Sequence, residues 1–360
     1  MDSKFLYKFD LNEHASGTWL YAYGSLASRE KKFFDDAQLQ QLFQVKSRKN
    51  LLNLMRDANY IGDSIDEALL NSEKEDLELL RSIMPSYELI KIFLITKDSH
   101  NLKAILRSTF SSNEKKSITD IQHLFLGPYS IEPKDILQKI RQENKKETNS
   151  TMQGDQAVAV SQVPDWMHET ILQAKKEYAE TLDMSRVDQI VEQATWKQLM
   201  LLIQELKSPW LQEYYLLKAD LKNLEILFRC RSLNLDKTFF EFSILEESSL
   251  EKEQWLDMFN LDNHALIKKL SEKGLEDFSE FVESYHKLGQ ASAFTQVVDR
   301  KLMLKLKEAK TFTAQQEKVA AYFLLRDMER KNIRIARACY NNNFSPERAS
   351  QLIRPAYRGV

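Results

Sequence analysis

Glycine and proline are scarce in this sequence. The chain of 360 residues contains 8 Gly and 7 Pro, far below the roughly 12% combined share typical of globular proteins. Because these two residues interrupt helices and form most tight turns, their scarcity predicts long uninterrupted helices. Apolar residues make up 43% of the chain, which is enough to build buried cores. We therefore predict an almost entirely α-helical protein with two or three packed units, as its length suggests.

An excess of positive charge is also missing. The 51 Lys and Arg nearly balance the 53 Asp and Glu, which argues against a nucleic-acid-binding protein. The most apolar stretch, ELIKIFLITK at 88–97, is far short of the ~20 residues that cross a bilayer. The first residues lack the pattern of a signal peptide, and two cysteines do not form a disulfide framework. We expect a cytoplasmic protein whose membrane contact, if any, comes through a partner.

Motifs for catalysis and cofactor binding are missing as well. No glycines have the spacing of a phosphate-binding loop, and no serine lies in a nucleophile elbow. The six histidines are scattered, without a pair at zinc-ligand spacing on a helix. Asp35-Asp36 is more typical of a solvated helix start than of a metal-binding acidic motif. We therefore predict no catalytic residue, no cofactor and no metal site.

A helical apolar pattern with an asparagine at its centre occurs three times. Around Asn332, the apolar residues Leu325, Met328, Ile335 and Cys339 lie at −7, −4, +3 and +7. Similar patterns surround two other asparagines, an acid lies three residues before each asparagine, and a small residue lies seven after it. The sets are Asp98, Asn101 and Ser108; Asp220, Asn223 and Cys230; and Glu329, Asn332 and Cys339.

Each asparagine must have hydrogen-bond partners if it is buried, because an unpaired buried amide costs about 1–3 kcal/mol. The simplest interpretation is that Asn101, Asn223 and Asn332 fix helix register within their own domains, while the acids are surface residues. The alternative is that the three carboxylates and amides line a shared axis and contact a partner. The small residues, both cysteines included, predict close helix packing rather than redox or metal chemistry.

Basic residues near the last asparagine leave a similar choice. Arg330, Lys331, Arg334 and Arg337 are typical of a solvated helix face, although they could also meet an acidic partner surface. We include Arg334 among the candidate structural or partner-contact residues.

The spacing of the three asparagines suggests domains rather than short repeats. They lie 122 and 109 residues apart, which is too far for a solenoid period of about 20–50 residues. This spacing predicts three similar helical domains at 1–125, 126–245 and 246–360. The segment 141–165 is polar and unpatterned, which predicts a mobile loop or linker.

Four short motifs predict helix starts. Three have the spacing of a capping box, and one is a serine followed by proline. These motifs are Ser64 with Glu67, Ser248 with Glu251, Thr313 with Gln316, and Ser345-Pro346.

The C-terminal stretch YFLLRDMERKNIRIARACYNNNFSPE resembles the signature of the C subunit of the V/A-type ATPases, which is also called the d subunit. The resemblance lies in an acid-x-x-Asn-Ile-Arg core, here Glu329, Asn332, Ile333 and Arg334. The N-terminal YAYGSLASREKKFFDDAQLQQLF is similar to the opening helix of that family, although Gly24, Leu26 and Ala27 stand where many relatives look more basic. The segment 141–165 looks longer than the family pattern.

This resemblance implies a mechanical role. It implies three helical domains arranged as a funnel around a pseudo-threefold axis, on the cytoplasmic face of the membrane proteolipid (c/K) ring. The funnel would receive the tip of the central shaft, made by subunits D and F. The chain would then be a non-catalytic rotor subunit that transmits torque for ATP-coupled ion transport.

Two other functions are compatible with the residues. An all-α enzyme could assemble its site from residues far apart in sequence, and inward carboxylates sharing a cavity would indicate one. An unrelated all-α scaffold or adaptor would need no catalytic motif either, although the spacing of the three asparagines argues against a solenoid.

Overall fold

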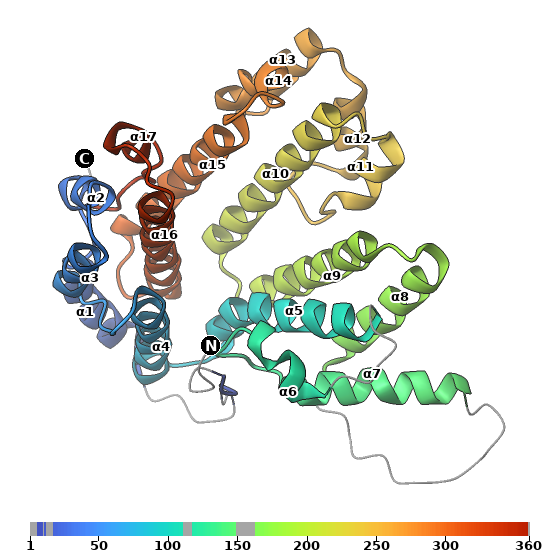
Figure 1. Cartoon of the computed structure of the whole chain (residues 1–360), viewed down its shortest axis with the longest axis horizontal. Helices are drawn as coiled ribbons and strands as arrows, with labels where there is room; N and C mark the ends of the chain where they lie inside the picture. The colour runs from blue at the N-terminus through green and yellow to red at the C-terminus, as the bar shows by residue number, and fades with distance from the viewer. Residues whose placement is uncertain (1–5, 10, 12–16, 111–116, 149–162, 359–360) are drawn as a thin grey trace. The chain divides into compact units, whose positions relative to one another are not determined.

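Helices make up almost all of the regular structure of this protein. The computed structural model describes residues 6–9, 11, 17–110, 117–148 and 163–358. Within these ranges there is no β-strand, only an isolated bridge between Lys8 and Tyr129 (Figure 1). The prediction of an all-α protein is therefore confirmed. In the same ranges, no helix combines the length and the apolar character needed to cross a membrane.

The chain divides into two compact units, and the first contains residues 1–14 and 87–207. Helix α5 lies at its centre and packs against both α7 and α9, while α8 and α9 form a helical hairpin. Leu94, Leu102 and Ile105 of α5 are fully buried, which explains why this helix carries the most apolar stretch of the sequence. The helices are α5 (Glu88–Phe110), α6 (Ile118–Ile121), η2 (Gln122–Leu124), α7 (Pro133–Thr148), α8 (Asp165–Thr181) and α9 (Met184–Glu205).

The second unit contains residues 15–86 and 208–360. Its helices are α1 (Trp19–Glu30), α2 (Asp36–Phe43), α3 (Arg48–Asp57), α4 (Ile65–Ile83), α10 (Pro209–Ser232), α11 (Lys237–Ser243), α12 (Lys252–Asn260), α13 (Asn263–Glu272), η3 (Glu276–Phe278), α14 (Phe281–Ser284), α15 (Gln290–Lys307), η4 (Glu308–Thr311), α16 (Gln316–Asn341) and α17 (Pro346–Ser350). The division into domains at 1–125, 126–245 and 246–360 stays a prediction.

The segment predicted as a linker begins as a helix. Helix α7 continues to Thr148, so residues 141–148 are helical and this part of the prediction is wrong. These polar residues contain no Gly or Pro that would end the helix. Residues 149–162 lie outside the described residues, and α8 begins at Asp165 within the same unit.

The helices of the two chain ends share one core in the second unit. Leu42 of α2, Leu51 and Met55 of α3, and Ile333 of α16 are all fully buried in one apolar cluster. Helix α16 also packs against α1, α2 and α4, and α17 packs against α2. The last long helix therefore depends on the first helices of the chain for the burial of its apolar face.

Two of the four predicted helix starts are confirmed. The hydroxyl of Ser64 accepts a hydrogen bond from the N–H of Glu67 at the start of α4. Ser345 caps α17 in the same way, with Pro346 at the first helical position. These caps satisfy N–H groups that a helix leaves unpaired at its start.

The other two predicted starts are displaced along the chain. Helix α12 is capped by Glu251, which forms a reciprocal capping box with Gln254. Ser248 does not cap this helix, because its hydroxyl accepts a hydrogen bond from the indole of Trp255 at 3.0 Å. Helix α16 begins at Gln316 with Gln315 as its N-cap rather than Thr313.

We expect Leu42→Ala to lower the free energy of unfolding by about 2–5 kcal/mol, because it removes a fully buried side chain and leaves a cavity. Leu20→Ala is the matched control, since Leu20 lies on α1 in the same unit and is 71% exposed. Denaturant unfolding of both variants measures the difference. Equal losses for the two leucines would contradict the assignment of the core.

Candidate functional site

Each of the three asparagines is buried and binds the backbone of a segment that follows its helix. Asn101 lies in α5, Asn223 in α10 and Asn332 in α16, and none is more than 2% exposed. In all three, the side-chain oxygen accepts the N–H of one later residue, and the side-chain nitrogen donates to the C=O of the same residue. The oxygen and nitrogen distances are 2.8 and 3.0 Å for Asn101 with Leu126, 2.8 and 2.8 Å for Asn223 with Leu245, and 2.8 and 3.2 Å for Asn332 with Arg354.

We call these arrangements the asparagine clamps. They confirm the prediction that each amide is hydrogen-bonded, and they show what it binds. The amide presents one acceptor and one donor side by side, which matches the C=O and N–H of a single residue in an irregular segment. Each clamp thereby satisfies backbone groups that would otherwise be buried without partners.

The acids three residues before the asparagines are buried, so the interpretation of them as surface residues is wrong. Asp98 is 1% exposed and Asp220 is 7% exposed. Residues three apart on a helix share one face, so Asp98 and Asp220 point toward the same segments as their asparagines. The Asp98 carboxylate accepts the N–H of Ser130 at 2.9 Å, the N–H of Ile131 at 3.1 Å and the hydroxyl of Ser130.

Asp220 repeats this arrangement. Its carboxylate accepts the N–H of Ser249 at 2.9 Å and the hydroxyl of the same serine. Each serine lies four residues after the residue that the asparagine clamps, Ser130 after Leu126 and Ser249 after Leu245. A sequence signal for these partners exists, because both serines begin a Ser-apolar-Glu tripeptide, 130–132 and 249–251.

The third acid binds a different part of the chain. Glu329 is 7% exposed, and its carboxylate accepts the N–H of Phe34 and the hydroxyl of Tyr60, both at 2.6 Å. It also accepts a hydrogen bond from Arg326 at 2.6 Å. In place of a serine four residues after the clamped Arg354 stands Arg358, whose guanidinium donates to the carbonyls of Lys31 and Phe33. The N-terminal segment thus supplies the partners that complete the third clamp.

A buried charged network joins α4 to α16 next to the third clamp. Asp76 of α4 accepts hydrogen bonds from Arg326 at 3.1 Å and Arg330 at 2.6 Å. Ser72 accepts another from Arg326 at 2.7 Å, and Tyr322 donates to Asp76 at 3.3 Å. Breaking such a pair by removing one partner is strongly destabilising, because the other charge stays buried without compensation.

A second buried ion pair supports the Arg354 segment. Asp299 of α15 is 2% exposed and lies 2.7 Å from Nε of Arg354. It also accepts from Nζ of Lys331 at 2.6 Å. Asn332 therefore binds the backbone of Arg354, while Asp299 binds its side chain.

Burial shifts the acid pKa values upward at all three clamps. For Asp98, desolvation outweighs the hydrogen bonds from Ser130 and Ile131 and raises the pKa to about 6. Desolvation also raises the pKa of Asp220 and of Glu329, against the lowering effect of their hydrogen-bond donors. These carboxyls lie inside the protein and are hydrogen-bonded to its own chain.

Arg334 is not part of a clamp. It lies on the exposed face of α16 and makes no hydrogen bond or ion pair within the described residues. The structure therefore brings six of the seven candidate residues into three acid–asparagine pairs, each in its own clamp, and leaves Arg334 toward solvent. Their roles as partner contacts stay predictions.

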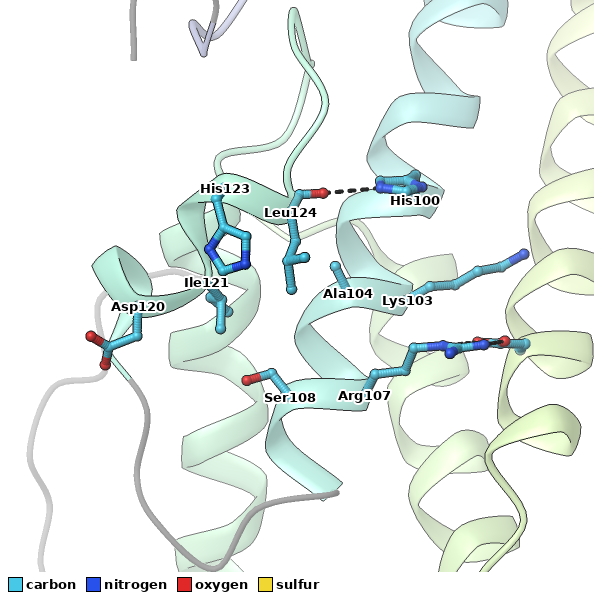
Figure 2. Close-up of a pocket in the computed structure, with 10 residues that line it drawn as sticks. His100, Lys103, Ala104, Arg107, Ser108, Asp120, Ile121, His123 and Leu124 are labelled. Atoms are coloured by element: carbon cyan, nitrogen blue, oxygen red, sulfur yellow. Dashed lines mark hydrogen bonds and ion pairs between the residues drawn. The ribbon is translucent and has the colours of Figure 1, made fainter. Parts of the chain in front are cut away.

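A cleft of about 850 Å³ opens beside α5 in the first unit (Figure 2). Ala104, Ile121 and Leu124 supply apolar lining, and several charged or polar side chains surround them. The residues are His100, Lys103, Ala104, Arg107, Ser108, Asp120, Ile121, His123, Leu124 and Asp188.

The two basic side chains Lys103 and Arg107 beside this cleft are each paired with a carboxylate. Arg107 forms a two-pronged ion pair with Asp188, Lys103 lies 3.4 Å from Glu192, and the ring of His100 contacts the carbonyl of Leu124 at 3.0 Å. Figure 2 draws no interaction between the ring of His123 and the other residues that line the cleft. The geometry therefore provides no general acid–base pair or activated nucleophile here.

The described residues also contain no group of three His, Cys, Asp or Glu side chains that could hold a metal ion. Cys230 and Cys339 are both buried thiols, 1% and 3% exposed. Burial raises the pKa of both, which disfavours the reactive thiolate.

The fold and the clamps define an all-α protein in which three long helices, α5, α10 and α16, each bind the backbone of a following segment. The family model of the ATP synthase (C/AC39) subunit matches residues 22–352. The chain therefore belongs to this family, whose members are subunits of V/A-type ATPases. No curated protein sequence matches the chain significantly.

We expect Asn332→Leu to lower the free energy of unfolding by about 2–5 kcal/mol, because it leaves the buried N–H and C=O of Arg354 without partners. Denaturant unfolding measures this loss. Asn50→Leu is the control, since Asn50 is exposed on α3 in the same unit. An unchanged midpoint for Asn332→Leu would show that the clamp contributes nothing to stability.

Asp98 predicts a pH dependence of stability. Its folded-state pKa of about 6 lies above the value of 3.8 expected when unfolded, so between these values the folded state binds more protons. Stability from this group is therefore present at acid pH and is lost as the pH rises through about 4 to 6. The loss is about 3 kcal/mol, because each pH unit between the two pKa values contributes about 1.4 kcal/mol.

Unfolding of the wild type and of Asp98→Asn at pH 4, 5, 6 and 7 measures this effect. The wild type should lose stability relative to Asp98→Asn as the pH rises. Glu180→Gln, on the exposed surface of α8 in the same unit, should show no such trend. A difference between wild type and Asp98→Asn that grows in the opposite direction would refute the assignment.

Proposed function

We propose that this protein is a non-catalytic central-stalk subunit of a V/A-type ATPase. In this role it joins the central shaft, made by subunits D and F, to the membrane proteolipid (c/K) ring. It transmits torque between them and thereby couples ATP hydrolysis or synthesis to ion transport. It lies on the cytoplasmic face of the membrane, in contact with the ring rather than with lipid.

Family membership over residues 22–352 is the observation that carries this proposal. The structure is consistent with this proposal, because a protein that transmits torque must not deform between its contact with the shaft and its contact with the ring. Each asparagine clamp ties an irregular segment to a long helix with two hydrogen bonds, and the acids at Asp98, Asp220 and Glu329 add further ones. Such ties remove local freedom from the loops between helices.

Three clamped helices also support the expectation of three similar domains around a pseudo-threefold axis, forming a funnel. Such a funnel would surround a rotating shaft with three similar domains. The site carboxylates are bound inside the chain, which suits a protein that works by packing and charge complementarity without chemistry of its own.

The test is binding of the purified chain to the shaft subunits D and F, and separately to the detergent-solubilised ring. We expect co-elution with each partner in size-exclusion chromatography, and no ATP hydrolysis by the chain alone. Co-elution with neither partner would overturn the proposed role of joining the shaft to the ring. Hydrolysis of ATP by the chain alone would contradict its non-catalytic character.

A further inference from the structure

Helix α3 and the residues before it carry positive charge without nearby acids in the sequence. Residues 37–56, which cover most of α2 and α3, contain four cations and no Asp or Glu. The cations are Lys46, Arg48, Lys49 and Arg56, and all four are exposed. We call these four residues the α3 basic surface. Three of them lie on α3 itself, and Lys46 lies two residues before its start.

The chain supplies no partner for these four side chains. Within the described residues they make no hydrogen bond, ion pair or ring contact. Asp57 is the one acid of α3, and it forms no ion pair with any of the four. The next acids along the chain, Asp36 and Asp63, do not pair with them either. The segment 46–57 therefore has four positive charges and one negative charge.

The helical spacing places two of the cations in line. Lys49, Asn53 and Arg56 are four and three residues apart, so they lie on one face of α3. All three are exposed, whereas Leu51 and Met55 on the other side of the helix are fully buried in the core. This exposed line is polar throughout, and both of its charged members are cations.

The cations at the start of α3 are also unfavourable for the helix. A helix N-terminus carries a partial positive charge, so acids stabilise it and cations do not. The first turn of α3 contains no acid, and Lys46, Arg48 and Lys49 all lie in or next to it. Helix α4 of the same unit, by contrast, begins with Asp66 and Glu67. Sequences break local rules of this kind mainly where a function requires it.

We propose that the α3 basic surface binds an acidic surface of another protein, whose carboxylates pair with its cations. This inference rests on the proposed function, in which the acidic surface belongs to the shaft subunits D and F. The carboxylates of the partner would supply the negative charge that the chain itself does not place beside these cations. Opposite charges on the two surfaces would also speed their association.

The packing of α3 argues against a membrane as the partner. A helix that lies on a bilayer buries its apolar face in the lipid. In α3 that face, with Leu51 and Met55, is already buried in the core together with residues of α2, α4 and α16. Aromatic side chains, which are typical of a membrane surface, are missing from residues 44–59. For the same reason we assign the acidic surface to the shaft rather than to the membrane ring.

A nucleic acid is also a poor match for the α3 basic surface. Helix α3 has 10 residues and is therefore about 15 Å long. Nucleic acids are bound by longer basic surfaces that follow their phosphates. The whole chain, moreover, has a net charge of −2.

The double variant Lys49→Gln with Arg56→Gln removes both charges of the exposed line and keeps polar side chains. We expect it to bind the shaft subunits D and F about tenfold more weakly than the wild type at low salt. The difference should shrink to less than about threefold in about 0.5 M salt, because salt screens exposed charges. The melting temperature should change by less than about 2 °C, since neither side chain has a partner within the described residues.

Two matched controls separate the effect of charge at this place from other effects. Lys49→Arg with Arg56→Lys keeps both positive charges and should bind the shaft like the wild type. Lys268→Gln with Arg300→Gln removes one exposed lysine of α13 and one exposed arginine of α15 in the same unit. This variant has the same net charge as the test variant, and it should also bind like the wild type.

The outcomes separate this inference from the proposed function. If the wild type binds the shaft and the test variant binds it equally well, the inference is overturned and the rotor function stands. Equal weakening by the α13–α15 control would overturn the inference as well, because net charge alone would then explain the loss. If the test variant loses binding to the ring, to phosphatidylserine vesicles or to a DNA duplex but keeps binding to the shaft, the surface belongs to that other partner. If the wild type binds neither shaft nor ring, the proposed function and the inference fail together.

Discussion

The hydrogen bonds of one buried asparagine in each of three long helices are the constraint on which this structure depends. A helix satisfies its own backbone, but the segments between helices do not, and here those segments are partly buried. Asn101, Asn223 and Asn332 supply the missing donor and acceptor. An apolar residue at these positions would bury more apolar surface, but it would leave two backbone groups without hydrogen-bond partners. Because that loss costs more, asparagine is the more stable choice here, although it is a poor helix former.

The acids extend the same principle, and the third shows how it joins the chain ends. Asp98 and Asp220 bind a serine that follows in sequence, so their clamps are closed by local chain. Glu329 instead binds Phe34 and Tyr60, which lie far away at the start of the chain. The same N-terminal helices cover the apolar face of α16 around Ile333. Polar and apolar contacts thus join the same two parts of the chain. Helix α16 depends on the N-terminal segment both for hydrogen-bond partners and for the burial of its apolar face.

Much of this could be predicted from the sequence, and the missing parts have a physical cause. Helical content follows from few Gly and Pro, and the need for partners at Asn332 follows from the cost of an unpaired amide. The clamped residues could not be named, because they lie 22 or 25 positions away in segments without periodicity. The burial of Asp98 could not be predicted from the sequence, because an acidic residue without an evident partner usually lies at the protein surface. Its donors include backbone N–H groups, which no side-chain pattern reveals.

Charged side chains that have partners within the chain differ in role from those that have none. Asp76, Glu329 and Asp299 are buried deeply, and each has at least two hydrogen-bonded partners from its own chain. Because donors from the same chain already occupy these carboxylates, they have little remaining capacity to bind a partner protein. Arg334 instead lies on the exposed face of α16 and makes no hydrogen bond or ion pair within the described residues. In the proposed role between two other subunits, both features matter: buried carboxylates that keep their partners within the chain, and exposed side chains that remain available to a partner protein.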